Sequence, residues 1–557
     1  MHQQLPNLEK YNLGKPNLEK LSLPQLVAQM FVVRASGYLF DHQIQYPAWE
    51  PSREQLRALV ADLGVGGVIF LGGSAAELSL RIQELQSWAE IPLLTAADIE
   101  EGVGQRFSGA TWFPPPMALG AIDQIDSALA GNYAYQMGAI TAQEAQAIGL
   151  NWLLAPVVDV NNNPDNPVIN VRAFGEDVAT VTRLTQAFIR GCQNSPVLTT
   201  AKHFPGHGDT AVDSHLELPV LSHSPERLES LELVPFRGAI EAGVDSIMSA
   251  HLLIPSWDAQ YPATLSPGIL TGKLRQELGF EGLIVTDALI MGGIANTYGA
   301  KEAPVLAVEA GADILLMPVD PAGAIAALVA AVETGRISLE RIHQSVERIW
   351  QAKQKIFSVV TPKSVTPKPE VNLALYLAQP QSLAIAEEII RKSLVVHGNL
   401  SRSCDKNHKT SPQNNLAFRN LLYTDEAIDC DFLSRQAPAI TIPKSLNYQL
   451  QIIDNYSGYI PDLEGTSQDL TATLRQTLLQ LFIRGNPFRG SAGATNTAQK
   501  LVKILLQLEE LQALVIYGSP YVYQQFRELL PEALPSIFTY AQTPLAQAVA
   551  LETLFSS

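Results

Sequence analysis

The sequence predicts an α/β protein: a (β/α)8 TIM-like barrel followed by a smaller C-terminal α/β domain. Short apolar runs alternate with segments of helical periodicity through the first 350 or so residues. Continuous apolar runs suit strands that are buried on both faces, as in a parallel sheet covered by helices. Eight such runs fit a closed barrel. An open doubly wound sheet is the alternative, but no GxGxxG segment follows its first strand.

The eight predicted strands share this apolar character. They are Met30–Val33, Val65–Leu71, Pro92–Ala96, Trp152–Val158, Val197–Ala201, Asp245–Ala250, Leu283–Thr286 and Ile314–Met317. The predicted helices between them are Arg53–Asp62, Ala76–Trp88, Ala128–Ala147, Val178–Cys192, Glu226–Ala242 and Pro304–Ala310. We therefore expect the barrel to occupy residues 23–360.

The remaining segments differ from the barrel in composition. Residues 1–22 form a predicted N-terminal arm, in which the sequence PNLEK occurs twice. Residues 361–379 form a predicted linker, because the stretch 361–371 contains three prolines. Residues 380–557 form the predicted C-terminal α/β domain, with a helix at Gln381–Lys392, strands at Ser393–Val396 and Ala513–Tyr517, and a polar loop at Ser401–Asn415. That domain has no cluster of catalytic residue types.

Charge and cysteine content narrow the class of protein. The formal net charge is −17, so the chain repels nucleic acid phosphates and anionic membrane surfaces. The cysteines Cys192, Cys404 and Cys430 are far apart, with neither a disulfide framework nor a CxxC metal pattern. No secretory signal pattern opens the chain, and no apolar stretch reaches the roughly 18 residues of a membrane span. We expect a cytoplasmic protein with no nucleic acid partner and no membrane span.

Polar residues follow five of the predicted strands. Asp98, Asp159, the pair Lys202–His203, His251 and Asp287 each follow one of them within two residues. Active sites of barrels lie where strands run into the following loops, so these residues predict a site at one end of the barrel. Asp159 could equally cap a loop, and His251 could be a packed, hydrogen-bonded histidine.

Histidine and aspartate residues are most concentrated in the segment 202–215. Of the ten histidines, five lie between positions 203 and 251. Three interpretations compete: a metal site, a glycine-rich structural loop in which His207 has a structural role, and acid/base catalysis on a sugar. The spacing matches neither HExxH nor a facial triad. Asp213 and His215 are two positions apart, so the carboxylate could set the imidazole tautomer and leave the other nitrogen for proton transfer.

The segment Lys202-His-Phe-Pro-Gly-His-Gly, followed after four residues by Asp213-Ser-His215, resembles the signature of glycoside hydrolase family 3 enzymes of the bacterial β-N-acetylglucosaminidase type. Three further segments resemble that family in the same order, at residues 98–107, 168–175 and 283–291. The resemblance covers most of residues 25–350. One departure is Val103, which stands where the family pattern has an arginine.

The resemblance implies a role for each matching residue. Asp287 would be the nucleophile, His215 the general acid/base and Asp213 its dyad partner. The residues implied in substrate binding are Asp98, Arg106, Arg172, Lys202 and His203. The family commonly carries a second α/β domain, which we expect here to be structural or to shape the edge of the site.

The resemblance therefore implies a retaining exo-β-N-acetylglucosaminidase that removes terminal GlcNAc from muropeptides or related chitin-like fragments in peptidoglycan recycling. It implies a small-molecule carbohydrate substrate and no metal or organic cofactor, since covalent catalysis by a carboxylate needs none. The sequence leaves open a phosphorylase, another β-glycosidase, a metal-dependent hydrolase and a non-catalytic muropeptide-binding protein. The oligomeric state is also open.

Overall fold

The structure is a computed structural model that describes residues 20–47, 49–210, 218–357, 372–400, 417–424, 430, 432–454, 475–484 and 492–556. It divides into two compact units, Met1–Phe113 with Asp123–Leu383, and Pro114–Ile122 with Ala384–Ser557. Most of the predicted arm, the predicted linker up to residue 371 and the predicted loop Ser401–Asn415 lie outside the described residues.

The first unit contains an eight-stranded parallel sheet in the order β10-β1-β2-β4-β6-β7-β8-β9. A parallel bridge between Val285 and Ile314 brings β9 back to the start of β10 and closes the sheet into a barrel. Each of the eight predicted strands overlaps an observed one, although the predicted strand Trp152–Val158 is reduced to two residues. The observed bounds are β1 Phe31–Ala35, β2 Gly67–Phe70, β4 Leu94–Ala97, β6 Trp152–Leu153, β7 Leu198–Phe204, β8 Ser246–Ser249, β9 Leu283–Val285 and β10 Leu315–Leu316.

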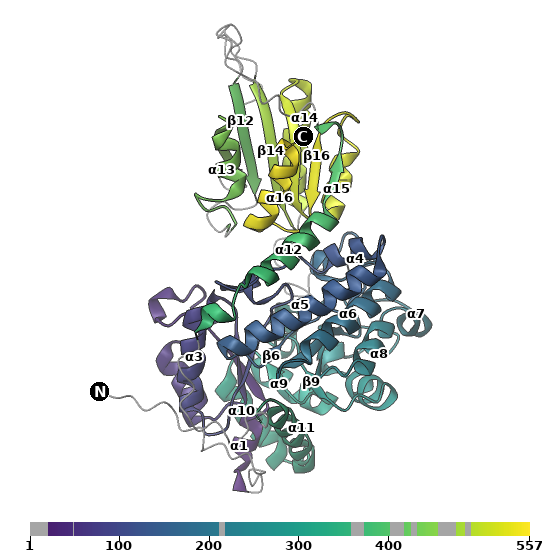
Figure 1. Cartoon of the computed structure of the whole chain (residues 1–557). Helices are drawn as coiled ribbons and strands as arrows, with labels where there is room; N and C mark the ends of the chain where they lie inside the picture. The colour runs from purple at the N-terminus through teal and green to yellow at the C-terminus, as the bar shows by residue number, and fades with distance from the viewer. Residues whose placement is uncertain are drawn as a thin grey trace, which may run out of the picture. The chain divides into compact units, whose positions relative to one another are not determined.

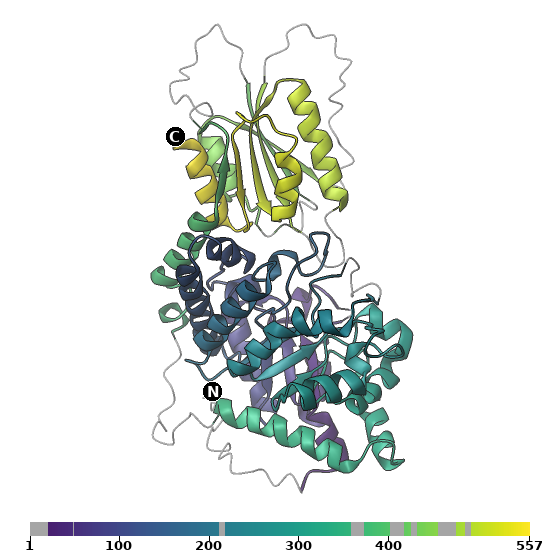
Figure 2. The ribbon, with the colours of Figure 1, turned by 90° about the vertical axis from the view of Figure 1, so that its right-hand side faces the viewer.

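Helices surround this sheet, as Figure 1 and Figure 2 show. The α-helices of the first unit are α1 Leu23–Ala28, α2 Arg53–Arg57, α3 Ala75–Trp88, α5 Ser127–Ile148, α6 Val178–Cys192, α7 Pro225–Ser230, α8 Leu233–Glu241, α9 Gly292–Ala310, α10 Pro321–Glu333 and α11 Leu339–Phe357. A further helix, α4, spans Met117–Asp123. The π-helical segments η4 Ala58–Asp62 and η8 Gly268–Glu277 complete the longer elements.

Three predicted helices differ from the observed ones. The segment Arg53–Asp62 changes from α-helix to π-helix at Ala58, and the segment Glu226–Ala242 is divided into α7 and α8. Helix α9 begins twelve residues before the predicted start at Pro304. It contains a kink at Gly299, whose φ of +76° a glycine adopts without the steric penalty of a side chain.

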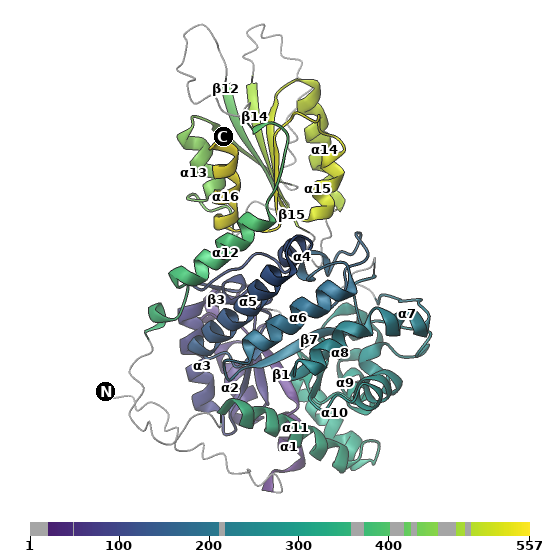
Figure 3. The same cartoon turned by 45° about the vertical axis from the view of Figure 1, so that its right-hand side comes forward.

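The smaller unit is a second α/β layer structure. Its sheet has the order β11-β16-β15-β14-β12-β13, and only the β11–β16 pair is antiparallel. The strands are β11 Val395–His397, β12 Ala417–Thr424, β13 Gln449–Asp454, β14 Arg475–Ile483, β15 Leu511–Gly518 and β16 Ser536–Thr539. Helices α13 Pro438–Ser445 and α16 Pro544–Phe555 cover one face, and α14 Ala492–Gln507 and α15 Pro520–Arg527 cover the other (Figure 3).

Helix α12, Pro380–Ser393, precedes this sheet, in agreement with the predicted helix Gln381–Lys392. The predicted strands near residues 395 and 513 are also observed, whereas β12, β13, β14 and β16 were not predicted from the sequence. Among the described residues, no helix combines the length and apolar character that a membrane span requires.

Candidate active site at the carboxyl ends of the barrel strands

Charged residues occupy the carboxyl ends of the barrel strands. Asp98 comes directly after β4, and Asp287 comes two residues after β9. Lys202 and His203 lie near the carboxyl end of β7, whose seven residues are all buried. Because the strands are parallel, these side chains reach the same end of the barrel, as the strand-end pattern predicts.

Lys202 lies at the centre of this charged group. Its side chain is 1% exposed, and its Nζ lies 2.6 Å from Asp98 Oδ1 and 2.7 Å from Glu100 Oε1. Burial alone would lower the pKa of Lys202, but the Asp98 and Glu100 carboxylates outweigh it and raise the pKa above 10.5. The ammonium group therefore stays charged and holds two carboxylates in fixed positions.

Glu100 is the second carboxylate and was not assigned a role from the sequence. Arg172 donates two hydrogen bonds to it, from Nε to Oε2 at 2.9 Å and from Nη2 to Oε1 at 2.8 Å. Burial would raise the pKa of Glu100, but Arg172 and Lys202 lower it well below 4.5. Arg172 also donates to the Val168 carbonyl at 3.0 Å, so its guanidinium is held on two sides. The available signal was the position of Glu100 two residues after Asp98 in the matching segment.

Arg106 is exposed and lies against the loop that follows β4. Its Nε donates to the backbone carbonyl of Asp98 at 3.1 Å. Val103, which replaces an arginine of the family pattern, is fully buried in the same loop. The loop thus presents a single outward arginine beside Asp98.

Asp159 joins two histidines of the segment after β7. Its Oδ2 lies 2.8 Å from His203 Nδ1, and its Oδ1 accepts a hydrogen bond from the His207 backbone N–H at 2.7 Å. His207 is itself buried, and its Nδ1 lies 2.8 Å from Thr210 Oγ1. Burial lowers the pKa of His207 to about 4, against the opposing charge of Asp159. His207 is therefore neutral near pH 7, and Asp159 shapes the loop that carries both histidines.

Asp287 is partly exposed at the end of β9. Its backbone N–H donates to the Ser249 carbonyl at 3.2 Å, and its Oδ1 accepts from the Ala288 N–H at 2.7 Å. The buried side chain of His251 supports this turn, because its Nε2 lies 3.1 Å from the Ala288 carbonyl oxygen. Its Nδ1 lies 2.8 Å from Thr264 Oγ1, so both ring nitrogens have partners. His251 is a packed residue behind Asp287.

Asp213 and His215, the predicted acid/base pair, lie outside the described residues, which stop at Thr210 and resume at Leu218. The chain on the two sides of this gap is joined by a charged cluster. His223 Nε2 lies 2.8 Å from Asp209 Oδ2, and Arg227 Nη2 donates to Asp209 at 3.0 Å and to Glu232 at 3.2 Å. Asp209 thus has two partners from beyond the gap.

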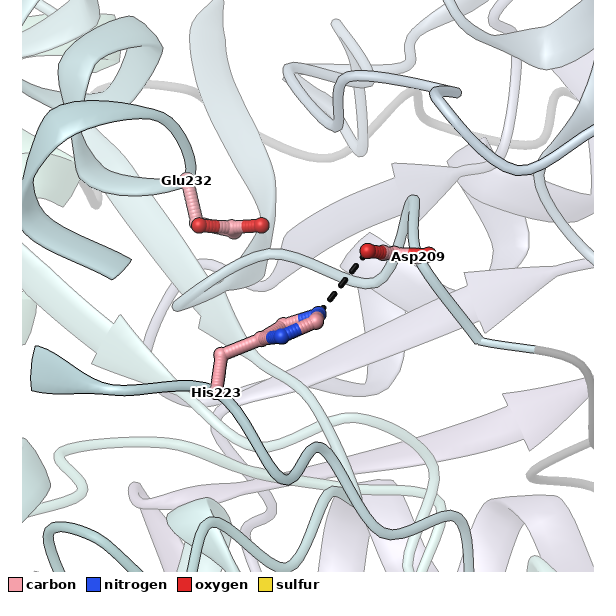
Figure 4. Close-up of side chains that lie close together, drawn as sticks. All are labelled: Asp209, His223 and Glu232. Atoms are coloured by element: carbon pink, nitrogen blue, oxygen red, sulfur yellow. Dashed lines mark hydrogen bonds and ion pairs between the residues drawn. The ribbon is translucent and has the colours of Figure 1, made fainter. Parts of the chain in front are cut away.

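Asp209, His223 and Glu232 also bring three atoms of metal-ligand type within 4.8 Å of one another (Figure 4). Glu232 Oε2 is buried and has no hydrogen-bond partner among the described residues. However, a guanidinium already bridges the two carboxylates, as the Arg227 contacts show. The arrangement is that of a neutralised ion cluster.

The fold is a (β/α)8 barrel accompanied by a second α/β unit. A carboxylate-rich site lies at the carboxyl ends of the barrel strands. Residues 22–352 match the model of the glycosyl hydrolase family 3 N terminal domain, and residues 411–556 match that of the bacterial glycosyl hydrolase family 3 C-terminal domain. The chain therefore belongs to glycoside hydrolase family 3.

Similar proteins carry related names. The chain is 34% identical over 333 residues to beta-hexosaminidase A of Pseudoalteromonas piscicida, covering 54% of this chain and 55% of that protein. It is 31% identical over 353 residues to the beta-N-acetylglucosaminidase/beta-glucosidase of Cellulomonas fimi, covering 62% and 61%. The matches thus span less than two thirds of the length of these two curated relatives.

A solved structure extends the similarity to nearly the whole chain. It is a glycoside hydrolase family 3 beta-N-acetylglucosaminidase from Paenibacillus sp. str. FPU-7, with a TM-score of 0.76 and 32% sequence identity. The comparison covers 96% of this chain and 97% of that one. The likeness therefore includes both the barrel and the smaller unit.

Proposed function

We propose that this protein is a retaining exo-β-N-acetylglucosaminidase that removes terminal GlcNAc from muropeptides or related chitin-like fragments. The observation that carries the proposal is the pairing of the buried Lys202 with Asp98 and Glu100. Lys202 is the first residue of the KHFPGHG segment that matches the family. Asp98 keeps part of its carboxylate exposed, so it can accept hydrogen bonds from sugar hydroxyls. The names of the relatives, which specify hexosaminides, support the same substrate class.

In the proposed mechanism Asp287 is the nucleophile. Its carboxylate attacks the anomeric carbon while protonated His215 gives its proton to the glycosidic oxygen, so the bond to the leaving group breaks and a glycosyl ester forms. In the second step His215 takes a proton from water, the resulting hydroxide attacks the anomeric carbon, and Asp287 leaves as a carboxylate. Asp213 would hold the His215 ring in the required tautomer.

The other matching residues would bind the sugar. Arg106 and Asp98 lie at one edge of the site, where a donor and an acceptor can engage neighbouring hydroxyls. Arg172 donates two hydrogen bonds to Glu100, and the His203 ring is paired with the Asp159 carboxylate. We therefore propose that Arg172 and His203 act mainly by keeping the site in shape.

The test is release of nitrophenol from aryl β-N-acetylglucosaminide and aryl β-glucoside, with and without phosphate. We expect turnover of the GlcNAc substrate, loss of at least about a thousandfold in Asp287→Ala and His215→Ala, and wild-type rates in the control Asp62→Ala, an exposed residue of η4. A phosphate-dependent rate with release of a sugar phosphate would favour a phosphorylase instead. Absence of turnover by folded protein would refute the catalytic proposal.

A cytoplasmic location and a role in peptidoglycan recycling belong to the same proposal. They are supported by the absence of a cysteine framework in the sequence and by the GlcNAc-containing substrate class. Cell fractionation with an antibody to the chain tests the location. Accumulation of GlcNAc-terminated muropeptides in a deletion strain tests the role.

A further inference from the structure

The loop after β1 reaches the same end of the barrel as Asp98. Strand β1 pairs with β2 so that Ala35 lies opposite Phe70, and β2 pairs with β4 so that Phe70 lies opposite Ala97. Asp98 is the next residue after Ala97. The loop that follows β1 therefore begins at the same end of the barrel as Asp98.

Two aromatic side chains of this loop lie exposed and stacked. The ring centroids of Tyr46 and Trp49 are 5.9 Å apart, with an interplanar angle of 20°. The two residues are 50% and 48% exposed. Their rings are too exposed to belong to the hydrophobic core, and adjacent exposed aromatic surface is a common mark of a binding site.

A buried ion pair holds the two rings in place. The Cζ atom of Arg34 lies 5.3 Å from the Tyr46 ring centroid and 5.4 Å from the Trp49 ring centroid. Arg34 Nη2 lies 3.2 Å from Oε1 of Glu50, and both side chains are largely buried. The cation–π contacts fix one side of the aromatic pair and leave the other side to solvent.

A further arginine lies at the end of the barrel that the loop after β1 reaches. Arg106 is an exposed residue of the loop that follows β4. It donates to the Asp98 carbonyl. Arg106 and Asp98 therefore lie together at the end of the barrel that the loop after β1 reaches.

We propose that Tyr46 and Trp49 form a platform for a sugar ring of the leaving group, on the far side of the bond that is cleaved. The apolar face of a pyranose can stack on an aromatic ring, and the exposed Arg106 can donate to one of its hydroxyl groups. The occupant is a GlcNAc-type oligosaccharide that extends beyond the cleaved residue. This inference rests on the proposed function, because it assigns the longer part of the same substrate.

The experiment compares a β-1,4-linked GlcNAc trisaccharide with GlcNAc β-fluoride, whose leaving group is too small to reach the platform. We expect Trp49→Ala and Tyr46→Ala to reduce kcat/KM for the trisaccharide about tenfold more than for the fluoride, mainly through KM. Trp49→Phe, which keeps a ring, should restore most of the loss. Equal losses on both substrates, or no loss on either, would overturn the proposal.

Trp88→Ala is the matched control. Trp88 is the last residue of α3 and also has cation–π contacts, with Arg53 at 5.4 Å and Arg57 at 6.0 Å. A helix that follows a barrel strand returns to the amino end of the next strand, so Trp88 lies away from the site. We expect Trp88→Ala to behave as wild type on both substrates.

A binding measurement separates this proposal from the proposed function. Titration calorimetry with a thio-linked GlcNAc trisaccharide, which resists hydrolysis, gives the affinity without catalysis. If wild type binds it and Trp49→Ala binds about tenfold more weakly, the platform is supported even when neither substrate is turned over. If wild type does not bind it, or binds as Trp49→Ala does, the platform is refuted.

Discussion

Lys202 Nζ lies 2.6 Å from Asp98 Oδ1 although the two residues are 104 positions apart in the chain. The contact crosses from β7 to the end of β4, with β6 between them in the sheet. It joins the one buried cation of the KHFPGHG segment to a partly exposed carboxylate at the mouth of the barrel. We expect both the stability and the activity of the site to depend on this pair.

Lys202→Met leaves Glu100 buried with Arg172 as its remaining cationic partner and releases Asp98. Removing one member of a buried ion pair commonly costs about 3–5 kcal/mol, so we expect the free energy of unfolding to fall by that amount. Activity on the aryl GlcNAc substrate should fall at least about a hundredfold. Urea unfolding and steady-state kinetics measure the two effects, and a variant with wild-type stability would contradict the first.

Lys353→Met is the contrasting substitution. Lys353 is also fully buried, but the only hydrogen bond of its Nζ among the described residues is to Gln29 Oε1, at 2.8 Å, and burial lowers its pKa to about 7. Between about pH 7 and 10.5 the unfolded chain binds a proton that the folded chain does not, so the stability of wild type rises with pH across that range. The variant should be about 2 kcal/mol more stable at pH 7 and show a flatter profile. A variant less stable than wild type at pH 7 would contradict this prediction.

Glu100→Gln tests the carboxylate that the sequence did not single out. Its folded pKa is depressed, so its stabilising contribution is present above about pH 4.5 and is lost as the pH falls below that value. We expect the variant to be less stable at pH 7 by about 3 kcal/mol and to lose less further stability on acidification than wild type. Thermal unfolding between pH 3 and 7 measures both. Parallel profiles for the two proteins would exclude Glu100 as a source of acid sensitivity.

His207 should make the stability of the protein depend on pH in a higher range than Glu100 does. Its folded pKa of about 4 lies below the ordinary 6.5, so between these values the unfolded chain binds more protons. Stability from this group is therefore complete above about pH 6.5 and declines as the pH falls toward 4. Carbon-13 NMR of histidine-labelled protein should show one imidazole, absent in His207→Asn, that stays neutral at pH 5. Titration of that resonance near pH 6.5 would refute the prediction.

Arg227→Met tests the cluster beside the segment that carries His215. Without the guanidinium, Asp209 and Glu232 lose their shared cationic partner, so we expect about a tenfold loss of kcat. Arg227→Lys should recover part of it, since an ammonium can still contact one carboxylate. Arg237→Met, whose arginine contacts only the Glu229 carbonyl among the hydrogen bonds described, is the control. Equal activity of the two methionine variants would refute the prediction that the Arg227 cluster supports catalysis.

The barrel was predictable because each strand is a short apolar run that local composition reveals. The position of Lys202 and His203 near a strand end was also predictable, since they follow such a run within a specific motif. Glu100 was not assigned, because its partner Arg172 is 72 positions away and only folding brings them together. Of the four strands of the smaller unit that were not predicted, β13 is an edge strand whose partly exposed residues give a weaker apolar pattern.

The amino-acid sequence by itself determined the order of the eight barrel strands, the residues placed at the strand ends and the family they resemble. Local periodicity and motif spacing are properties of neighbouring residues, so no tertiary information was needed for them. The tertiary structure decided which charges meet: Lys202 with Asp98 and Glu100, Asp159 with His203, and Arg34 with the exposed pair Tyr46 and Trp49. The contacts of Lys202 and Asp159 join residues at the ends of different strands of the sheet, which only folding brings within a few ångströms.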